Sequence, residues 1–323
     1  MCSKIKNGVY GTWQFGICFK KDRIQWYIFD IRRSEFVIGE TTSSAVRVLP
    51  FNTSQLKSIS GVIKWLGIRG IDNSDIILAF LFEQRTSKYY LVTLRDDQDH
   101  ITVIYEHFTY ITRVVELTQS VMIKDEQDVL YAIIIWQTDG IKPKTFAHAL
   151  RINVSVPSGM ISTRIAVDEN FEGKWYRPFI IENHLVLRVG IAYSLSFPLR
   201  KMSKLTDDED LVNKSQISVP KIQCINKGGL KNDSANLFFG PVLYGDSALH
   251  YVHNTVNNDG QLWAYQWKLS LWKPVNVRLT RHAFNRFVTM HIVDNVLYMH
   301  GDCATKSCKT RAHIHYVDLA NKL

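Results

Sequence analysis

An acidic or asparagine turn residue followed by an apolar strand recurs along this chain at steps close to 50 residues. These residues are Asp22, Asp75, Asp128, Asn183, Asp246 and Asn295, at steps of 53, 53, 55, 63 and 49 residues. The runs that follow are rich in Val, Ile, Leu and aromatic residues, which favours strands. A repeat near ~50 residues with several strands is typical of propeller blades, because a four-stranded unit buries both faces only between neighbours.

The hairpin from Phe287 to Cys303 shows the repeated unit most clearly. Side chains alternate in character along FVTMHIV before the turn and along VLYMHG after it, which is the period of a strand. Asp294 and Asn295 stand between the two runs, and both residue types tolerate the left-handed backbone that a two-residue turn requires. The sequence therefore predicts an antiparallel hairpin centred on this pair.

Extended over the whole chain, the pattern predicts a single all-β domain, a six-bladed β-propeller of four-stranded antiparallel blades. The expected blades lie near residues 11–51, 56–108, 112–168, 174–226, 235–280 and 284–319. The last unit is one strand short, and residues 3–10 could supply that strand and so remove the last free sheet edges. The step of 63 residues indicates a surface insertion at 204–229 with one short strand, Ile217–Val219 or Ile222–Ile225.

Units five and six resemble kelch-type blades. The resemblance lies in NVLYMHG from Asn295 with HYVDL from His315, and in LWAYQ from Leu262 with Trp272 after a short turn. Unit one is similar, with Phe36 where the kelch pattern has a tryptophan, although the kelch pair of glycines is missing from every unit. The resemblance implies a six-bladed propeller that binds proteins through loops on one face, often as an adaptor in a larger assembly.

Composition excludes several classes of protein. With 323 residues, of which 46% are hydrophobic, the chain can bury a large core. No apolar run approaches the ~20 residues that a helix needs to span a bilayer. If the chain is complete, its first residues contain no secretory signal, and we expect a cytoplasmic or nuclear protein. Five cysteines in a chain of this length do not form a disulfide framework.

The net charge of +9 suggests an acidic partner, and two basic clusters of the last unit are candidate binding residues. Loops between the second and third strands share a face with the links between blades, because antiparallel strands alternate direction. We expect the clusters to form one rim that binds an acidic protein partner or is simply solvated. Nucleic acid is not expected, because nothing resembles an RNA-recognition motif. The six residues are Arg281, His282, Arg286, Lys306, Lys309 and Arg311.

One stretch gathers residue types that ligate metals, namely Cys303, Cys308, His313 and His315. Zinc requires four such ligands that converge tetrahedrally. The spacing between the two cysteines is loose, and histidines in strands often fill half-buried positions. We therefore predict no metal and no cofactor.

Two functions are consistent with these observations. The main expectation is a non-catalytic interaction scaffold or adaptor, and the alternative is a propeller hydrolase acting in the central funnel. The sequence has no nucleophile elbow, no Gly-rich phosphate loop and no zinc-protease helix motif. Propeller hydrolases take carboxylates from central strands, but the candidates here fall at predicted turns, where Asp is common anyway. These candidates are Asp125, Glu126, Asp128 and Asp168.

Overall fold

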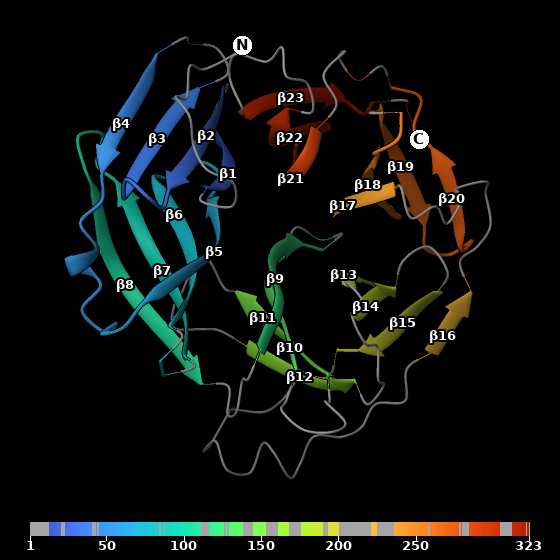
Figure 1. Cartoon of the computed structure of the whole chain (residues 1–323), viewed down its shortest axis with the longest axis horizontal. Helices are drawn as coiled ribbons and strands as arrows, with labels where there is room; N and C mark the ends of the chain where they lie inside the picture. The colour runs from blue at the N-terminus through green and yellow to red at the C-terminus, as the bar shows by residue number, and fades with distance from the viewer. Residues whose placement is uncertain are drawn as a thin grey trace.

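The apolar runs that follow the periodic turn residues form strands, and these strands assemble into the antiparallel sheets of a β-propeller (Figure 1). The computed structural model describes residues 13–20, 23–40, 43, 45–83, 85–86, 88–110, 116–125, 127, 129–137, 145–152, 161–167, 176–189, 193–199, 221–224, 236–257, 259–277, 279, 284–303, 312–320 and 322. Over these ranges, no helix is both long enough and apolar enough to cross a membrane.

Blades 1 to 3 each have four strands, and each strand pairs with the next along the chain. Blade 1 consists of β1 (Trp13–Lys20), β2 (Arg23–Asp30), β3 (Glu35–Glu40) and β4 (Val46–Pro50). Blade 2 follows the short 3₁₀ turn η1 (Thr53–Gln55) and consists of β5 (Ile63–Gly70), β6 (Ile76–Glu83), β7 (Lys88–Asp96) and β8 (Ile101–Tyr110). Blade 3 consists of β9 (Glu116–Lys124), β10 (Leu130–Gln137), β11 (Thr145–Ile152) and β12 (Ile161–Val167).

Blades 4 and 5 also have four strands, whereas the last sheet has three. Blade 4 consists of β13 (Tyr176–Ile181), β14 (His184–Val189), β15 (Tyr193–Pro198) and β16 (Lys221–Cys224). Blade 5 consists of β17 (Asn236–Tyr244), β18 (Ser247–Asn254), β19 (Asp259–Gln266) and β20 (Leu271–Pro274). The last sheet consists of β21 (Phe284–Val293), β22 (Val296–Cys303) and β23 (Ala312–Asp318).

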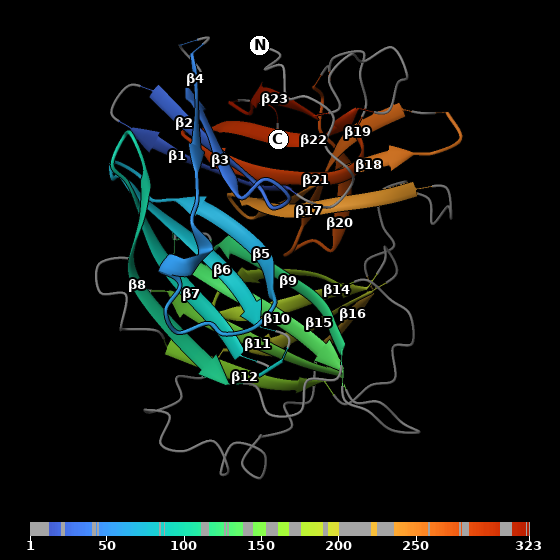
Figure 2. The same ribbon diagram turned by 60° about the vertical axis from the view of Figure 1, so that its left-hand side comes forward.

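The first strand of every sheet faces the propeller axis. Strands β1, β5, β9, β13, β17 and β21 contact one another in this order, and β21 contacts β1 again. The fourth strands lie at the periphery, as Figures 1 and 2 show. The sheets therefore close into a ring, and their first turns meet around the axis.

The expectation of six blades with four strands each is wrong. Five blades are complete, whereas β23 pairs only with β22 among the described residues. The backbone turns after β23, where the Leu319 amide donates to the carbonyl of Asn295 at 2.9 Å. The closing strand expected at residues 3–10 lies outside the described ranges and stays a prediction. Of the insertion expected at 204–229 the structure describes β16, which overlaps the second of the two strand positions expected there.

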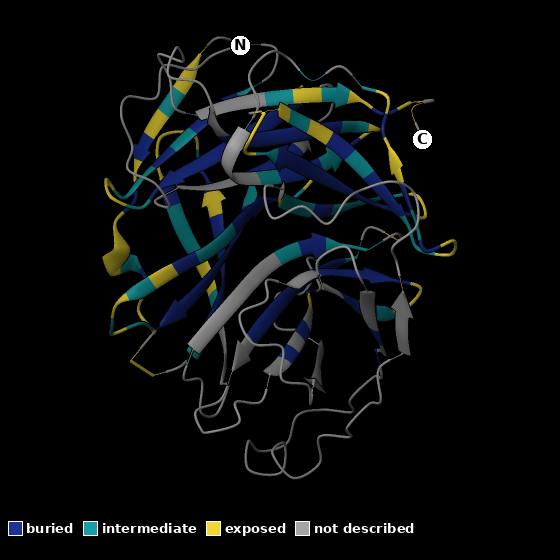
Figure 3. Cartoon of the chain, turned by 45° about the vertical axis from the view of Figure 1, so that its right-hand side comes forward, coloured by how far each residue is buried: buried dark blue, intermediate teal, exposed yellow. Residues whose placement is uncertain are grey.

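The blades are covered on both faces, and much of their described strand surface is buried, as the dark blue ribbons of Figure 3 show. In β6, for example, seven consecutive residues from Ile77 to Glu83 are buried. An aromatic cluster fills the seam between blades 1 and 2, where the Phe29 and Trp65 rings lie 3.9 Å apart. Phe36 and Phe51 complete this cluster. Packing between blades is therefore the main apolar contribution to the fold.

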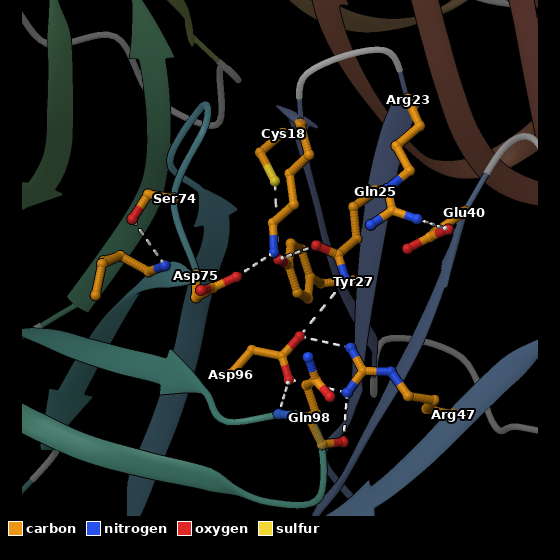
Figure 4. A network of polar contacts seen from close by, with 12 residues as sticks. Cys18, Arg23, Gln25, Tyr27, Glu40, Arg47, Ser74, Asp75, Asp96 and Gln98 are labelled. Atoms are coloured by element: carbon orange, nitrogen blue, oxygen red, sulfur yellow. Dashed lines mark hydrogen bonds and ion pairs between the residues drawn. The ribbon is translucent and has the colours of Figure 1, made fainter.

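A polar network crosses the same seam (Figure 4). The Arg47 guanidinium of β4 donates to both carboxylate oxygens of Asp96 in β7, at 2.9 and 2.6 Å. Gln25 of β2 donates to the same carboxylate at 3.5 Å, and its amide oxygen accepts a hydrogen bond of 2.9 Å from the Tyr27 hydroxyl. Burial raises the pKa of the neighbouring Cys18 thiol to about 11, so this cysteine stays a neutral thiol.

A second buried carboxylate, Glu83 at the end of β6, organises the loop before β5. It accepts hydrogen bonds from the Ser60 amide at 3.0 Å, the Thr86 hydroxyl at 2.5 Å and the Tyr90 hydroxyl at 3.0 Å. Burial by itself raises the pKa of Glu83, but these bonds and one from the Gly61 amide outweigh it and lower the pKa. Glu83 therefore stabilises the fold in its ionised form.

We expect Glu83→Gln to lower the free energy of unfolding by about 2 kcal/mol at neutral pH, because an amide cannot accept all of these bonds. The pKa of Glu83 is lower in the folded protein than in the unfolded chain. The stabilisation is therefore fully present at pH values above the ordinary Glu pKa of about 4.3, and it is lost as the pH falls through the pKa of Glu83 in the folded protein. Urea denaturation at about pH 7 and pH 4 measures both effects. The control is Glu40→Gln, which removes a surface ion pair with Arg23 and should cost under about 1 kcal/mol. Equal losses of unfolding free energy in Glu83→Gln and Glu40→Gln would contradict the conclusion that Glu83 stabilises the fold as an ionised carboxylate.

Candidate functional site

The turns between the first and second strands of the sheets meet at one end of the axis. Because every sheet begins innermost and its strands alternate direction, these turns share one face, which we call the axial mouth. Asp294 and Asn295 have φ angles of 48° and 61°, and Glu182 and Asn183 have φ angles of 49° and 59°. The predicted left-handed hairpin turn at Asp294-Asn295 is therefore confirmed.

A cavity of about 320 Å³ opens at the axial mouth between the turns of blades 2, 3 and 5 and of the last sheet. This volume is within the range of small-molecule sites. Its apolar wall comes from Leu243, Ile292 and Val293. Its polar lining consists of Asp72, Lys124, Asp125, Tyr244, Asp294 and Asn295. Three carboxylates against one ammonium group make the lining acidic.

Contacts within the lining fix several of these side chains. Lys124 at the end of β9 donates to the Asp72 carboxylate of the β5–β6 turn at 3.2 Å. Oδ1 of the Asp125 carboxylate accepts hydrogen bonds from the amides of Gln127 and Val129 at 2.9 Å each. These bonds hold the Asp125 carboxylate against its own turn.

Side chains from different sheets also join the turns to one another. The Tyr244 hydroxyl of β17 donates to the Asn295 side chain of the β21–β22 turn at 3.1 Å. Lys20 of β1 pairs with Asp75 of blade 2 at 2.5 Å, beside the Asp72–Lys124 pair of blades 2 and 3. The turn between β5 and β6 is therefore tied to both neighbouring blades. Of these two pairs, Asp72–Lys124 lines the cavity, whereas Lys20 and Asp75 lie outside it.

The basic rim predicted from the sequence falls almost entirely outside the described residues. This applies to Arg281, His282, Lys306, Lys309 and Arg311. Arg286 lies near the start of β21, opposite Asp302 in the register with β22, whereas Asp294 follows the other end of β21. The backbone position of Arg286 is thus on the face opposite the axial mouth, and the rim itself stays a prediction.

The predicted cysteine and histidine cluster is only partly described. Cys303 ends β22, and His313 and His315 lie in β23 opposite Gly301 and Met299. Cys308 lies outside the described residues. In the part of the chain that the structure describes, no three His, Cys, Asp or Glu side chains are grouped so that they could hold a metal ion.

Of the carboxylates considered for catalysis, only Asp125 is placed, and it lines the cavity. Glu126, Asp128 and Asp168 lie outside the described residues. Sequence reasoning missed Asp72, Lys124 and Tyr244 and treated Asp294 only as a turn residue. All four stand within four positions of a periodic turn residue. In a propeller the first turns of all blades converge, so this spacing could have identified them.

The chain matches no protein-family model and none of the curated proteins. Among solved structures it is similar to an oligogalacturonate lyase in complex with manganese, with 10% identity over 97% of this chain and 77% of that chain and a TM-score of 0.45. It is also similar to an oligogalacturonate lyase from Vibrio parahaemolyticus, with 10% identity over 95% and 75% of the two chains and a TM-score of 0.43. The β-propeller domain of the Trilobed protease from Pyrococcus furiosus aligns at 10% identity over 82% and 98%, with a TM-score of 0.26.

These comparisons correct the main functional expectation. Both lyases named above align with 95% or more of this chain and are named as enzymes, so the comparisons do not bear out the expectation of a non-catalytic scaffold. A kelch-type propeller is not confirmed, since no family model matches. At 10% identity the likeness concerns the propeller fold and not the reaction.

Proposed function

We propose that this protein is a propeller hydrolase that binds a small substrate in the cavity at the axial mouth. The observation that carries the proposal is that Asp125 and Asp294, from different sheets, line one cavity together with Lys124 and Tyr244. Hydrolysis requires one group that activates water and one that protonates the leaving group, and two carboxylates on one cavity can fill both roles.

The contacts favour a particular division of roles. Asp125 is held by the amides of Gln127 and Val129, so its carboxylate has a fixed direction and suits a general base. Asp294 comes from a different sheet and lines the same cavity, so we assign to it the second role, proton donation to the leaving group. Lys124, which pairs with Asp72, can stabilise negative charge that develops on the substrate.

The lining also limits the substrate. Three carboxylates and one ammonium group repel anions and favour a neutral or positively charged molecule. Leu243, Ile292 and Val293 offer an apolar surface for one side of that molecule. Neutral glycosides combine these features, because a sugar has polar edges and an apolar face. The acidic lining disfavours uronates, which the names of the two lyases specify, and these are not part of the proposal.

The test is a panel of chromogenic neutral glycosides, carboxylic esters and phosphate esters. We expect turnover of a neutral member of the panel, and a loss of about 10²–10⁴-fold in kcat for Asp125→Asn and for Asp294→Asn. The matched control is Asp75→Asn, whose carboxyl is 67% exposed and pairs with Lys20 outside the cavity, so it should keep full activity. A folded protein that hydrolyses no member of the panel, or cavity variants as active as the control, would contradict the proposal.

A further inference from the structure

A buried contact links two sheets that are far apart in the sequence. The Arg69 guanidinium near the end of β5 lies 3.2 Å from Nδ1 of His291 in β21, and 222 residues separate them. Arg69 is 7% exposed and His291 is 4% exposed. Strand β1 contacts both β5 and β21. The contact thus ties blade 2 to the last sheet at the point where the ring closes.

A glycine in β1, Gly16, allows Arg69 to lie this close to His291. A Cβ atom at Gly16 would lie 2.6 Å from the Ile68 carbonyl oxygen and 2.9 Å from Cα of Arg69. Both of those atoms belong to the backbone and cannot move aside cheaply. Only glycine therefore lets β1 lie this close to β5 and leaves Arg69 near the last sheet.

The chemistry of the two groups determines the protonation state of His291. A guanidinium has only N–H donors, so Nδ1 of His291 must accept through its lone pair. An imidazole that accepts at Nδ1 is neutral and carries its proton on Nε2. Uptake of a second proton would occupy Nδ1, break the hydrogen bond and leave two cations about 3 Å apart inside the protein.

Three other titratable groups of the last sheet stand on this face. Tyr298 stands opposite His291 in the register, Tyr316 stands opposite Tyr298, and His300 shares their face. Burial raises the pKa of Tyr298, as do the charges of Tyr316 and Asp294, so this phenol stays neutral through the acid range. Val293 and Tyr298 pack with Ile17 and Trp26 of blade 1, so the face with His291 is the seam between the last sheet and blade 1.

We propose that Arg69 and His291 form an acid-sensitive latch that closes the propeller ring. While His291 is neutral, the latch holds β21 to blade 2 across β1, and a proton taken from solvent onto Nδ1 releases it. The latch adjoins the axial mouth, because His291 precedes Ile292 and Val293 of the cavity wall and Arg69 lies three positions before Asp72. Acid would thereby loosen two walls of the cavity. The proposal does not depend on hydrolysis at that cavity.

The first test compares melting temperatures between about pH 8 and pH 5 for the wild type, His291→Gln and Arg69→Met. We expect acid to lower the wild-type melting temperature by roughly 3 °C more than that of either variant. The matched control is His253→Gln, since burial lowers the pKa of His253 against an opposing effect of Asp259 and makes it a second acid-sensitive group away from the latch. In His253→Gln, acid should still lower the melting temperature by the additional amount that the Arg69–His291 latch causes in the wild type. Wild type and His291→Gln curves that stay parallel would overturn the proposal.

The second test measures the protonation state of His291 directly in the wild-type protein. In wild-type protein with ¹⁵N-labelled histidine at about pH 7.5, we expect one neutral imidazole protonated on Nε2 whose Nδ1 signal shifts in Arg69→Met. A charged His291 at that pH, or one protonated on Nδ1, would overturn the proposal.

Discussion

Asp96→Ala is expected to lower the free energy of unfolding by about 3 kcal/mol, the lower end of the range for breaking a buried ion pair. The Asp96 side chain is 2% exposed and accepts both guanidinium bonds from Arg47. It also accepts from the Gln98 amide at 3.0 Å. Without the Asp96 carboxylate, these donors have no acceptor at the seam between blades 1 and 2. The lower end applies because Arg47 is 37% exposed and can turn toward water.

Chemical denaturation monitored by circular dichroism measures this loss, with Asp75→Ala as the matched control. Asp75 also pairs with a basic residue of blade 1, but its side chain is 67% exposed, so its removal should cost under about 1 kcal/mol. Arg47→Met combined with Asp96→Ala should cost less than the sum of the two single variants, because each removes the partner of the other. A loss in Asp96→Ala no greater than in Asp75→Ala would show that burial does not strengthen the Arg47–Asp96 pair.

Trp65→Ala is expected to lower the free energy of unfolding by about 3–5 kcal/mol, as for other buried large side chains. Trp65 is 5% exposed, and its ring lies 3.9 Å from Phe29 and 5.9 Å from Phe51. The substitution leaves a cavity in the aromatic cluster that joins blades 1 and 2. That seam cannot collapse readily, because both blades are also held by their other neighbours in the ring.

The comparison variants are Trp65→Phe, which keeps a ring in the cluster, and Trp263→Ala in blade 5. Trp263 is only partly buried, and its indole N–H donates to Gln261 in its own strand. We expect both comparison variants to lose less than half as much stability as Trp65→Ala. If Trp65→Ala lost no more stability than Trp263→Ala, the aromatic cluster would stabilise the fold no more than an ordinary half-buried tryptophan.

The expected basic rim and the acidic cavity illustrate the limits of local sequence information. Clusters of basic residues are visible in the sequence itself, and they led to the prediction that Arg286 and Lys309 are binding residues. The axial cavity gathers three Asp residues and one Lys residue from three sheets, and no short window of sequence contains more than two of them. Their common feature is the position beside a periodic turn, which acquires meaning only once the ring is closed.

The sequence by itself determined the secondary structure and the class of fold. Apolar runs after spaced turn residues predicted the strands, and Asp294 and Asn295 predicted the hairpin turn whose φ angles the structure shows. These signals are local, since they depend on residues a few positions apart. Tertiary structure decided that the last sheet has three described strands, and it decided the contacts of Asp96 with Arg47 and of His291 with Arg69. Such contacts depend on how one blade packs against the next, and the period of a strand carries no information about its partner across a seam.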